Sequence, residues 1–437
     1  MVAVYSAERL GEAEVTARSR QRGEPDWLTD RRLAGWKAFE NNPMPKLERT
    51  TLQESLLQGF RLPEPQPRVS AWAELPVELR ETVGIEEAPA DAVVLANGYL
   101  RFARLSAELA EKGVFVGSLA EAAAQRPDLV RDYVMGEAVP ADSDKPWALN
   151  GALWGDGLLI YVPEGVEVKA PLQAFMWGEG EVGVFDRTVV VAAPNSDVTV
   201  VETVASPASG APRLRTGVVE VYALDGARIK FCALQTLGHG VNNLVLRRAV
   251  VGPNASVQWI VGEFGSSLTA GLTESLLQGR GGESSNVTVF FAGKGQHLDV
   301  EPRMFHTGTH TQSNISVKGV VKGGGRAVYA PVTSMEDQAD EAAAFQKGTT
   351  LILDPESRAY SMPQLFVAEE QVAGAGHAAT IGQVDPEQIF YLRSRGLSEA
   401  QARRLLVHGF FHPVIDSVPV DAVKERLTAL VDRKLDQ

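Results

Sequence analysis

The chain has 437 residues, of which 44% are hydrophobic and 22% are charged, a composition typical of a soluble globular protein with a sizeable core. Its 42 Lys and Arg residues against 55 Asp and Glu residues give a net charge of −13, which argues against nucleic-acid binding because acidic surfaces repel phosphates. A charged N-terminus and the absence of any run of 18 apolar residues favour a cytoplasmic protein that does not span a membrane.

The chain contains a single cysteine, Cys232, so it forms no internal disulfide. One thiol cannot hold a stable iron–sulfur cluster either, because such clusters are typically bound by four ligands, most of them thiolates. Cys232 lies in an alternating apolar stretch, and a free cysteine in that setting is commonly a small buried residue.

Residues 1–150 are predicted to form a mostly helical N-terminal domain. The apolar residues Leu33, Trp36 and Phe39 recur every three positions, which indicates an amphipathic helix over residues 27–39 that ends before Pro43. A proline-rich linker is expected over residues 60–75. A strand over residues 92–100 and helices over residues 105–111 and 119–134 are expected to follow.

Residues 151–382 are predicted to be almost entirely β. A turn followed by a strand recurs, and successive turn residues are separated by 31, 28, 30, 41 and 32 positions; these residues are Asn195, Gly226, Asn254, Ser284, Gly325 and Ser357. A period near 30 indicates stacked coils, as in a parallel β-helix, because each coil buries its inward face against the next. A β-sandwich with coincidental turn spacing fits the spacing alone about equally well.

Residues 383–437 are predicted to form a C-terminal helical segment. Pro386 follows an acidic residue at a helix start, and Gly396 ends that first helix. Ser398 and Gln401 form a capping box for a second helix that runs through Leu406. A third helix is expected from about Val420 to residue 435.

Several catalytic motifs are absent. The glycine runs at residues 279–282 and 323–325 lack the Lys-Ser/Thr of a phosphate-binding loop, and are interpreted as turns. His306 and His310 have a spacing that aligns two ligands only on a helix, and this stretch looks extended, so a packing or surface role is favoured. The carboxylates between Glu336 and Glu341 are interpreted as a solvated loop. With these motifs absent, the remaining enzyme alternative is a β-helix carbohydrate-active enzyme, and such an enzyme needs a carboxylate-lined groove.

The run GHAATIGQVD at residues 376–385, followed by FYLRSRG at residues 390–396, closely resembles a junction of the SufB/SufD family. Shorter family-like stretches lie at residues 43–45, 160–163, 310–313 and 361–365, so the resemblance covers about residues 25–435. The resemblance implies a mainly β fold: a right-handed parallel β-helix flanked by an N-terminal mixed helical region and a C-terminal helical segment.

Within that family the chain resembles SufD most closely. SufB-like chains carry cysteines near the positions of Val251 and of Lys347-Gly348, where this chain has none. The resemblance implies that His377 is the histidine which SufD contributes as a candidate transient ligand for iron or a cluster at the SufB interface. SufD-like chains often have a cysteine two residues earlier, where this chain has Ala375. The alternative is that His377 is only a structural residue at a strand end.

The resemblance implies a non-enzymatic scaffold subunit of the SUF iron–sulfur cluster assembly complex. The expected partners are a SufB-like paralogue, with which a transient cluster is shared, and a SufC-like ATPase that docks on the C-terminal helical segment. A homodimer that works as a SufB-like scaffold is the alternative assembly. Nothing in the sequence supports a reduced flavin as a further cofactor.

Overall fold

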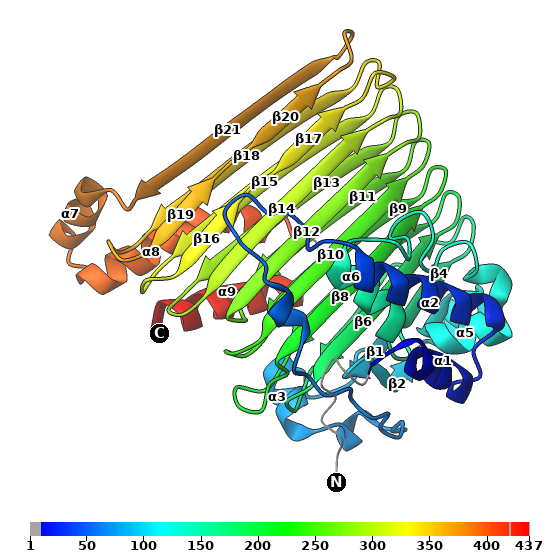
Figure 1. Cartoon of the computed structure of the whole chain (residues 1–437). Coiled ribbons are helices and arrows are strands. Elements are labelled where there is room, and N and C mark those ends of the chain that lie inside the picture. The colour runs from blue at the N-terminus through cyan, green and yellow to red at the C-terminus, as the bar shows by residue number, and fades with distance from the viewer. Residues whose placement is uncertain (1–9, 419–420, 437) are drawn as a thin grey trace.

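The computed structural model describes residues 10–418 and 421–436. Its centre is a β-solenoid of about eight turns, built from two sheets whose strands alternate along the chain (Figure 1). The strands within each sheet are parallel, apart from the antiparallel pairs β1–β2 and β3–β4. The predicted mainly β fold with parallel stacked coils is therefore confirmed, and the β-sandwich alternative is wrong.

Each turn of the solenoid contributes to both sheets. The ten-stranded sheet contains, in spatial order, β2 (Tyr99–Arg104), β1 (Ala92–Ala96), β5 (Leu172–Trp177), β7 (Asp197–Ala205), β9 (Arg228–Thr236), β11 (Ser256–Glu263), β13 (Glu283–Ala292), β15 (Gln312–Val321), β18 (Ala343–Ile352) and β21 (Gly374–Gln383). The eleven-stranded sheet contains β19 (Arg358–Ser361), β16 (Arg326–Tyr329), β14 (His297–His306), β12 (Leu268–Leu277), β10 (Asn242–Val251), β8 (Leu214–Ala223), β6 (Gly183–Ala192), β4 (Leu158–Val162) and β3 (Phe115–Ser118). It also contains β17 (Val332–Met335), which pairs with β14, and β20 (Gln364–Val367), which pairs with β17.

The strand register explains the repeat in the sequence. The first residues of β7, β9, β11, β13, β15, β18 and β21 pair in one column at intervals of 31, 28, 27, 29, 31 and 31 residues. The turns before the first six of these strands each place one residue in the left-handed region: Asn195, Gly226, Asn254, Gly281, His310 and Glu341.

One of the six predicted turn residues was misplaced, and two others lie at turns of a different edge. Ser284 lies inside β13, and Gly325 and Ser357 precede β16 and β19 at the opposite edge of the solenoid. The 41-residue interval in the sequence pattern therefore joined turns from two different edges. The period was right because both edges repeat with the same coil length.

Three apolar layers hold the fold together. Between the two sheets lie inward-facing side chains such as Val198, Phe231 and Trp259. The outer face of the eleven-stranded sheet packs against the N-terminal helices, and the outer face of the ten-stranded sheet packs against the C-terminal helices. Each sheet is therefore buried on both faces over much of its area, which explains its long apolar runs.

The N-terminal region contains α1 (Glu12–Gln21), α2 (Asp26–Asn41), α3 (Val77–Val83), α4 (Ala107–Glu111), α5 (Leu119–Gln125) and α6 (Lys145–Leu153). The helix predicted over residues 27–39 is α2, and it ends before Pro43 as expected. The single strand predicted over residues 92–100 is instead the hairpin β1–β2, because Asn97 and Gly98 turn the chain with positive φ. The helix predicted over residues 119–134 stops at Gln125, because Pro127 follows.

The C-terminal region contains α7 (Pro386–Ser394), α8 (Glu399–Asp416) and α9 (Asp421–Asp436). The predicted capping box is present, since Ser398 accepts from the Gln401 amide and the Gln401 side chain accepts from the Ser398 amide. Helix α8 continues beyond the predicted end at Leu406. The predicted start of the third helix, Val420, lies outside the described residues. No helix in the described part of the chain combines the length and apolar character that crossing a membrane requires.

Candidate functional site

In the part of the chain that the structure describes, the solenoid ends in a rung that no further coil covers. Strand β21 is the last strand of the ten-stranded sheet, and it pairs with β18 along its whole length (Figure 1). Within residues 10–418 and 421–436, no strand pairs with its other edge. Its backbone N–H and C=O groups on that side are consequently available to another chain, as at any unprotected sheet edge.

His377 lies in the middle of this last strand. It pairs in register with Gln346 of β18, whose buried side chain points inward and donates hydrogen bonds to the Thr333 hydroxyl at 2.6 Å and to the Gln364 carbonyl at 3.0 Å. Paired residues of parallel strands point to the same side, so His377 occupies the inward side of the open end. Its side chain is exposed, and it makes no hydrogen bond or ion pair with the described residues. The imidazole is therefore accessible to an external ligand.

The neighbours of His377 allow close approach. Ala375, Gly376 and Ala378 are small, and a methyl group added at Gly376 would touch only the Phe345 ring, at 3.5 Å. Large apolar side chains are exposed around the same end of the solenoid: Phe345 by 56%, Phe366 by 55%, Val367 by 45% and Ile381 by 37%. Exposed apolar side chains gathered at one end of a molecule are typical of a contact surface.

The sequence interpretation had missed this apolar surface. A signal was present in β18, where the alternation is reversed: the inward residue Gln346 is polar, and the outward residue Phe345 is aromatic. Such a reversal is expected where a strand no longer has the usual interior on one side and solvent on the other.

A complete metal site is not formed by the described residues, since no three His, Cys, Asp or Glu side chains converge. Cys232 lies on the outward face of β9 among the apolar residues beneath α8 and α9, and it is fully buried. Burial raises the pKa of its thiol to about 12, so the neutral form predominates. Its interpretation as a small buried apolar residue is confirmed.

The two histidines at residues 306 and 310 lie in different environments. His306 is fully buried, with Nδ1 2.8 Å from the Thr311 hydroxyl and Nε2 2.8 Å from the Ser313 hydroxyl. Burial lowers the pKa of His306 to about 4, which keeps the ring neutral at physiological pH. His310 is exposed at a turn, with φ of 59°. The expected packing and surface roles are both observed.

The remaining polar motifs lie in turns. Gly279 packs against the backbone of the preceding turn, where an added methyl group would lie 2.0 Å from the Pro253 nitrogen, so this glycine permits close stacking. Glu336, Asp337 and Asp340 lie in the turn between β17 and β18, where Ser334 donates to Glu336 at 2.7 Å. The turn interpretation of both motifs is confirmed.

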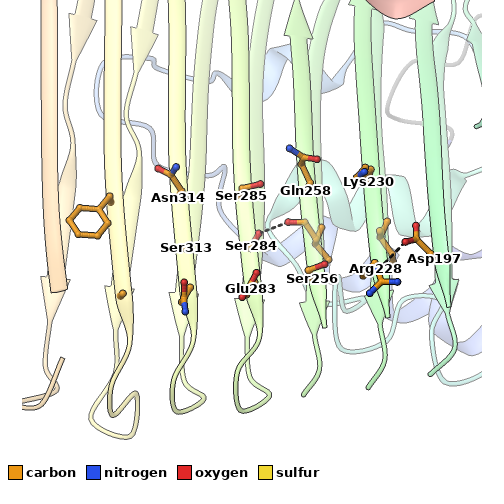
Figure 2. A pocket seen from close by; sticks show the side chains of 15 residues that line it. Asp197, Arg228, Lys230, Ser256, Gln258, Glu283, Ser284, Ser285, Ser313 and Asn314 are labelled. Atoms are coloured by element: carbon orange, nitrogen blue, oxygen red, sulfur yellow. Dashed lines mark hydrogen bonds and ion pairs between the residues drawn. The ribbon is translucent and has the colours of Figure 1, made fainter. Parts of the chain in front are cut away.

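A groove of about 780 Å³ crosses the outer face of the ten-stranded sheet (Figure 2). Its two carboxylates, Asp197 and Glu283, are the first residues of strands that lie three positions apart in the sheet. At roughly 4.8 Å per strand they are separated by about 14 Å. Paired glycosidase carboxylates are separated by about 5–9.5 Å, so this groove does not have that geometry.

A second groove, of about 400 Å³, lies where α7 and α8 meet the ends of β18 and β21. On α7, Phe390 is 76% exposed and Tyr391 is 56% exposed, and Arg393 lies one turn further along beside the groove. These residues belong to the FYLRSRG motif. The motif therefore does not form core; it displays two aromatic rings on the surface beside the open end.

The chain matches two family models that together cover most of its length. Residues 25–174 match the SufBD protein N-terminal region, and residues 175–410 match the SufBD core domain, which is described as acting in SUF-system FeS cluster assembly. Proteins named as iron–sulfur cluster assembly SufBD family proteins in Staphylococcus epidermidis and Staphylococcus aureus strain USA300 are each 32% identical over 435 residues, covering 97% of this chain and 93% of theirs.

The family models extend across both sheets and the open end with its GHAATIGQVD strand, and the full-length relatives span the same elements. The chain belongs to the SufBD family of iron–sulfur cluster assembly proteins.

Proposed function

We propose that this chain is a SufD-like, non-enzymatic scaffold subunit that holds a nascent cluster jointly with a partner docked on its open end. The observation that carries the proposal is the position of His377, accessible on an unpaired edge strand among small residues and exposed apolar side chains. A single imidazole with no competing hydrogen bond supplies one ligand, and the other ligands must come from the partner.

The partner in this proposal is a SufB-like paralogue that contributes thiolates. A neutral imidazole binds iron well. Ligands divided between two chains form a shell that can open, which suits a cluster that is held transiently and then handed on. The buried thiol of Cys232 and the alanine at residue 375 leave this chain without an accessible sulfur ligand.

A SufC-like ATPase is the proposed partner of the surface formed by α7 and the neighbouring groove. Phe390 and Tyr391 offer exposed aromatic area, of the kind that commonly anchors protein interfaces. The groove beside them adds a concave surface with Arg393, Glu399 and Arg403 at its rim. Energy from ATP would enter through this partner, because the glycine runs of this chain are turns.

A homodimer is the second candidate assembly, because the same free edge of β21 could pair with a second copy. That arrangement would bring two His377 side chains to the junction but no accessible thiol. The heteromeric assembly supplies a more complete ligand set, so we favour it.

Co-purification tests the proposal. Tagged chain expressed with the SufB-like and SufC-like proteins of its own organism is expected to recover both, and anaerobic isolation should show an iron–sulfur chromophore on the complex. Recovery of the tagged chain alone or only as a homodimer, under conditions that preserve other SUF complexes, would contradict the heteromeric proposal.

A further inference from the structure

The outer face of the ten-stranded sheet is divided into two halves. On β7, β9 and β11 the third outward side chains, Val201, Cys232 and Ile260, are apolar and buried in the layer that α8 and α9 form with the sheet. The first two outward positions are mostly polar and carry no helix over them. This uncovered half forms the large groove shown in Figure 2.

We call this uncovered half the polar strip. It consists of two rows of side chains that run across the strands from β7 to β18: Asp197, Arg228, Ser256, Glu283 and Gln312 in one row, and Lys230, Gln258, Ser285, Asn314 and Phe345 in the other. Figure 2 shows Lys230, Gln258, Ser285 and Asn314 aligned on successive strands.

The strip has hydrogen-bonding capacity that this chain does not use. Asp197 and Arg228 form an ion pair at 2.9 Å. Among the described residues, no other side chain of the strip takes part in a side-chain hydrogen bond or ion pair. Its two acidic and two basic side chains balance, so the strip does not select a polyanion such as nucleic acid. A polypeptide, which offers both donors and acceptors, fits this mixture.

The strip is continuous with the open end of the solenoid. Its last side chain, Phe345, lies over Gly374 and Gly376 of β21, with ring atoms 3.4 and 3.5 Å from where their Cβ atoms would be. Phe345 is nevertheless 56% exposed. A chain that pairs with the free edge of β21 would therefore meet Phe345, and beyond it the row that leads to Lys230.

We propose that the polar strip is a second docking surface for the paralogous chain that caps the last rung, occupied by an extended polar segment of that chain. The inference rests on the proposed function. An apolar side chain of the segment packs on Phe345, and an acidic side chain pairs with Lys230. Four strand spacings, about 19 Å, separate these two anchors, a distance that roughly six extended residues span.

The test compares three variants of the full chain, each co-expressed with the SufB-like paralogue. Gln258→Arg combined with Ser285→Arg fills the strip at β11 and β13, away from β21. Ile381→Asp alters the last rung only. Gln125→Arg on the exposed surface of α5 is the matched control for an added charge. Thermal unfolding of each chain alone establishes that it is folded, and titration of the paralogue gives the Kd.

The strip variant is expected to weaken binding at least tenfold, and the Gln125→Arg control is expected to bind normally. A photo-crosslinking residue placed at position 258 should attach to the paralogue. If the strip variant binds normally and position 258 gives no crosslink while Ile381→Asp abolishes binding, the strip is only a solvated surface and the end-capping proposal stands. If neither variant changes binding, the strip proposal and the proposed end-capping are both wrong.

Discussion

Among individual residues, burial separates the reactive side chains of this chain into inert and accessible groups. The Cys232 thiol is buried beneath α8 and α9. The His306 ring is buried inside the solenoid, where its two nitrogens form hydrogen bonds with the Thr311 and Ser313 hydroxyls. His377 is instead exposed on an edge strand. The residue types by themselves rank cysteine above histidine as a cluster ligand, and accessibility reverses that order here.

His377→Ala tests the proposed ligand. The variant complex is expected to assemble with unchanged subunit ratio, because removing an exposed side chain changes stability by only about 1 kcal/mol or less. Its cluster content, measured by iron and sulfide analysis after anaerobic isolation, should fall strongly. Thr380→Ala, an exposed change on the same strand, should retain its cluster. An intact His377→Ala complex that loads normally would assign His377 a purely structural role.

Glu202 gives the fold a pH dependence. It is fully buried inside the solenoid, and burial raises its pKa, while Arg215, Arg247 and a hydrogen bond from Thr188 lower it in part. A carboxyl whose pKa is raised on folding stabilises the folded state below its unfolded pKa, and this contribution is lost as pH rises through the folded pKa.

Glu202→Gln should therefore raise the melting temperature relative to wild type at pH 8, and less so at pH 5. Glu283→Gln, at an exposed position, is the control and should show no such trend. Melting curves at the two pH values measure the effect. Equal shifts at both pH values would mean that Glu202 is not protonated on folding.

At the scale of elements, the C-terminal helices serve two purposes. Helices α8 and α9 bury an apolar layer against the ten-stranded sheet, so they are part of the core. Helix α7 contributes one buried side chain, Ile389, and leaves Phe390 and Tyr391 in solvent. The helices differ in burial because of where they lie: α7 follows directly after the last strand at its end, whereas α8 and α9 run back across the sheet.

The double variant Phe390→Ser with Tyr391→Ser tests the docking role of α7. Both rings are largely exposed, so stability should change by no more than about 0.5 kcal/mol for each. Co-purification of the SufC-like ATPase is expected to fall at least tenfold. Val77→Ser removes a comparably exposed apolar side chain from α3 and should leave ATPase recovery unchanged. Undiminished recovery in the double variant would place the ATPase contact elsewhere.

Leu427→Ala tests the structural role of α9. Leu427 is buried against the sheet, close to Gly262 of β11. Truncating a buried leucine typically costs about 2–5 kcal/mol, through lost apolar contact and the cavity that remains. Denaturant unfolding measures the loss, and Ala429→Ser on the exposed side of the same helix is the control. A loss below about 1 kcal/mol would show that α9 is only loosely attached.

For the molecule as a whole, the two ends of the solenoid differ. The antiparallel hairpin β1–β2 lies at the first end of the ten-stranded sheet, in the region packed with N-terminal helices. At the other end, within the described residues, no strand pairs with the outer edge of β21, and apolar side chains are exposed around it. Under the proposed function, this asymmetry assigns partner docking to one end of the solenoid.

The isolated chain is accordingly expected to bind no stoichiometric cluster. Its described residues hold no convergent set of three ligands, and its one cysteine is buried. Anaerobic reconstitution with iron and sulfide, followed by absorption spectroscopy after desalting, should leave no stable chromophore. A persistent four-iron spectrum on the lone chain would contradict this expectation.

The sequence by itself determined the type of fold and the family. A coil period near 30 residues follows from strand and turn lengths, which are local properties, and the capping box at Ser398 is a local hydrogen-bonding pattern. The motif containing His377 could be recognised in the sequence because its residues are contiguous. What each residue faces was decided only by the tertiary structure, since it depends on strand register and on which elements cover each sheet.

The turns at Gly325 and Ser357 were found, but not that they lie at the opposite edge of the solenoid, because two edges with one period cannot be distinguished along the sequence. The polar strip and the exposed ring of Phe345 could not be predicted because they depend on which part of the sheet the helices cover. Helices α8 and α9 pack over one half of the outer face of the ten-stranded sheet and leave the other half open. The open end is likewise a property of the stack, since β21 has the composition of a strand but lacks a neighbour on one side among the residues that the structure describes.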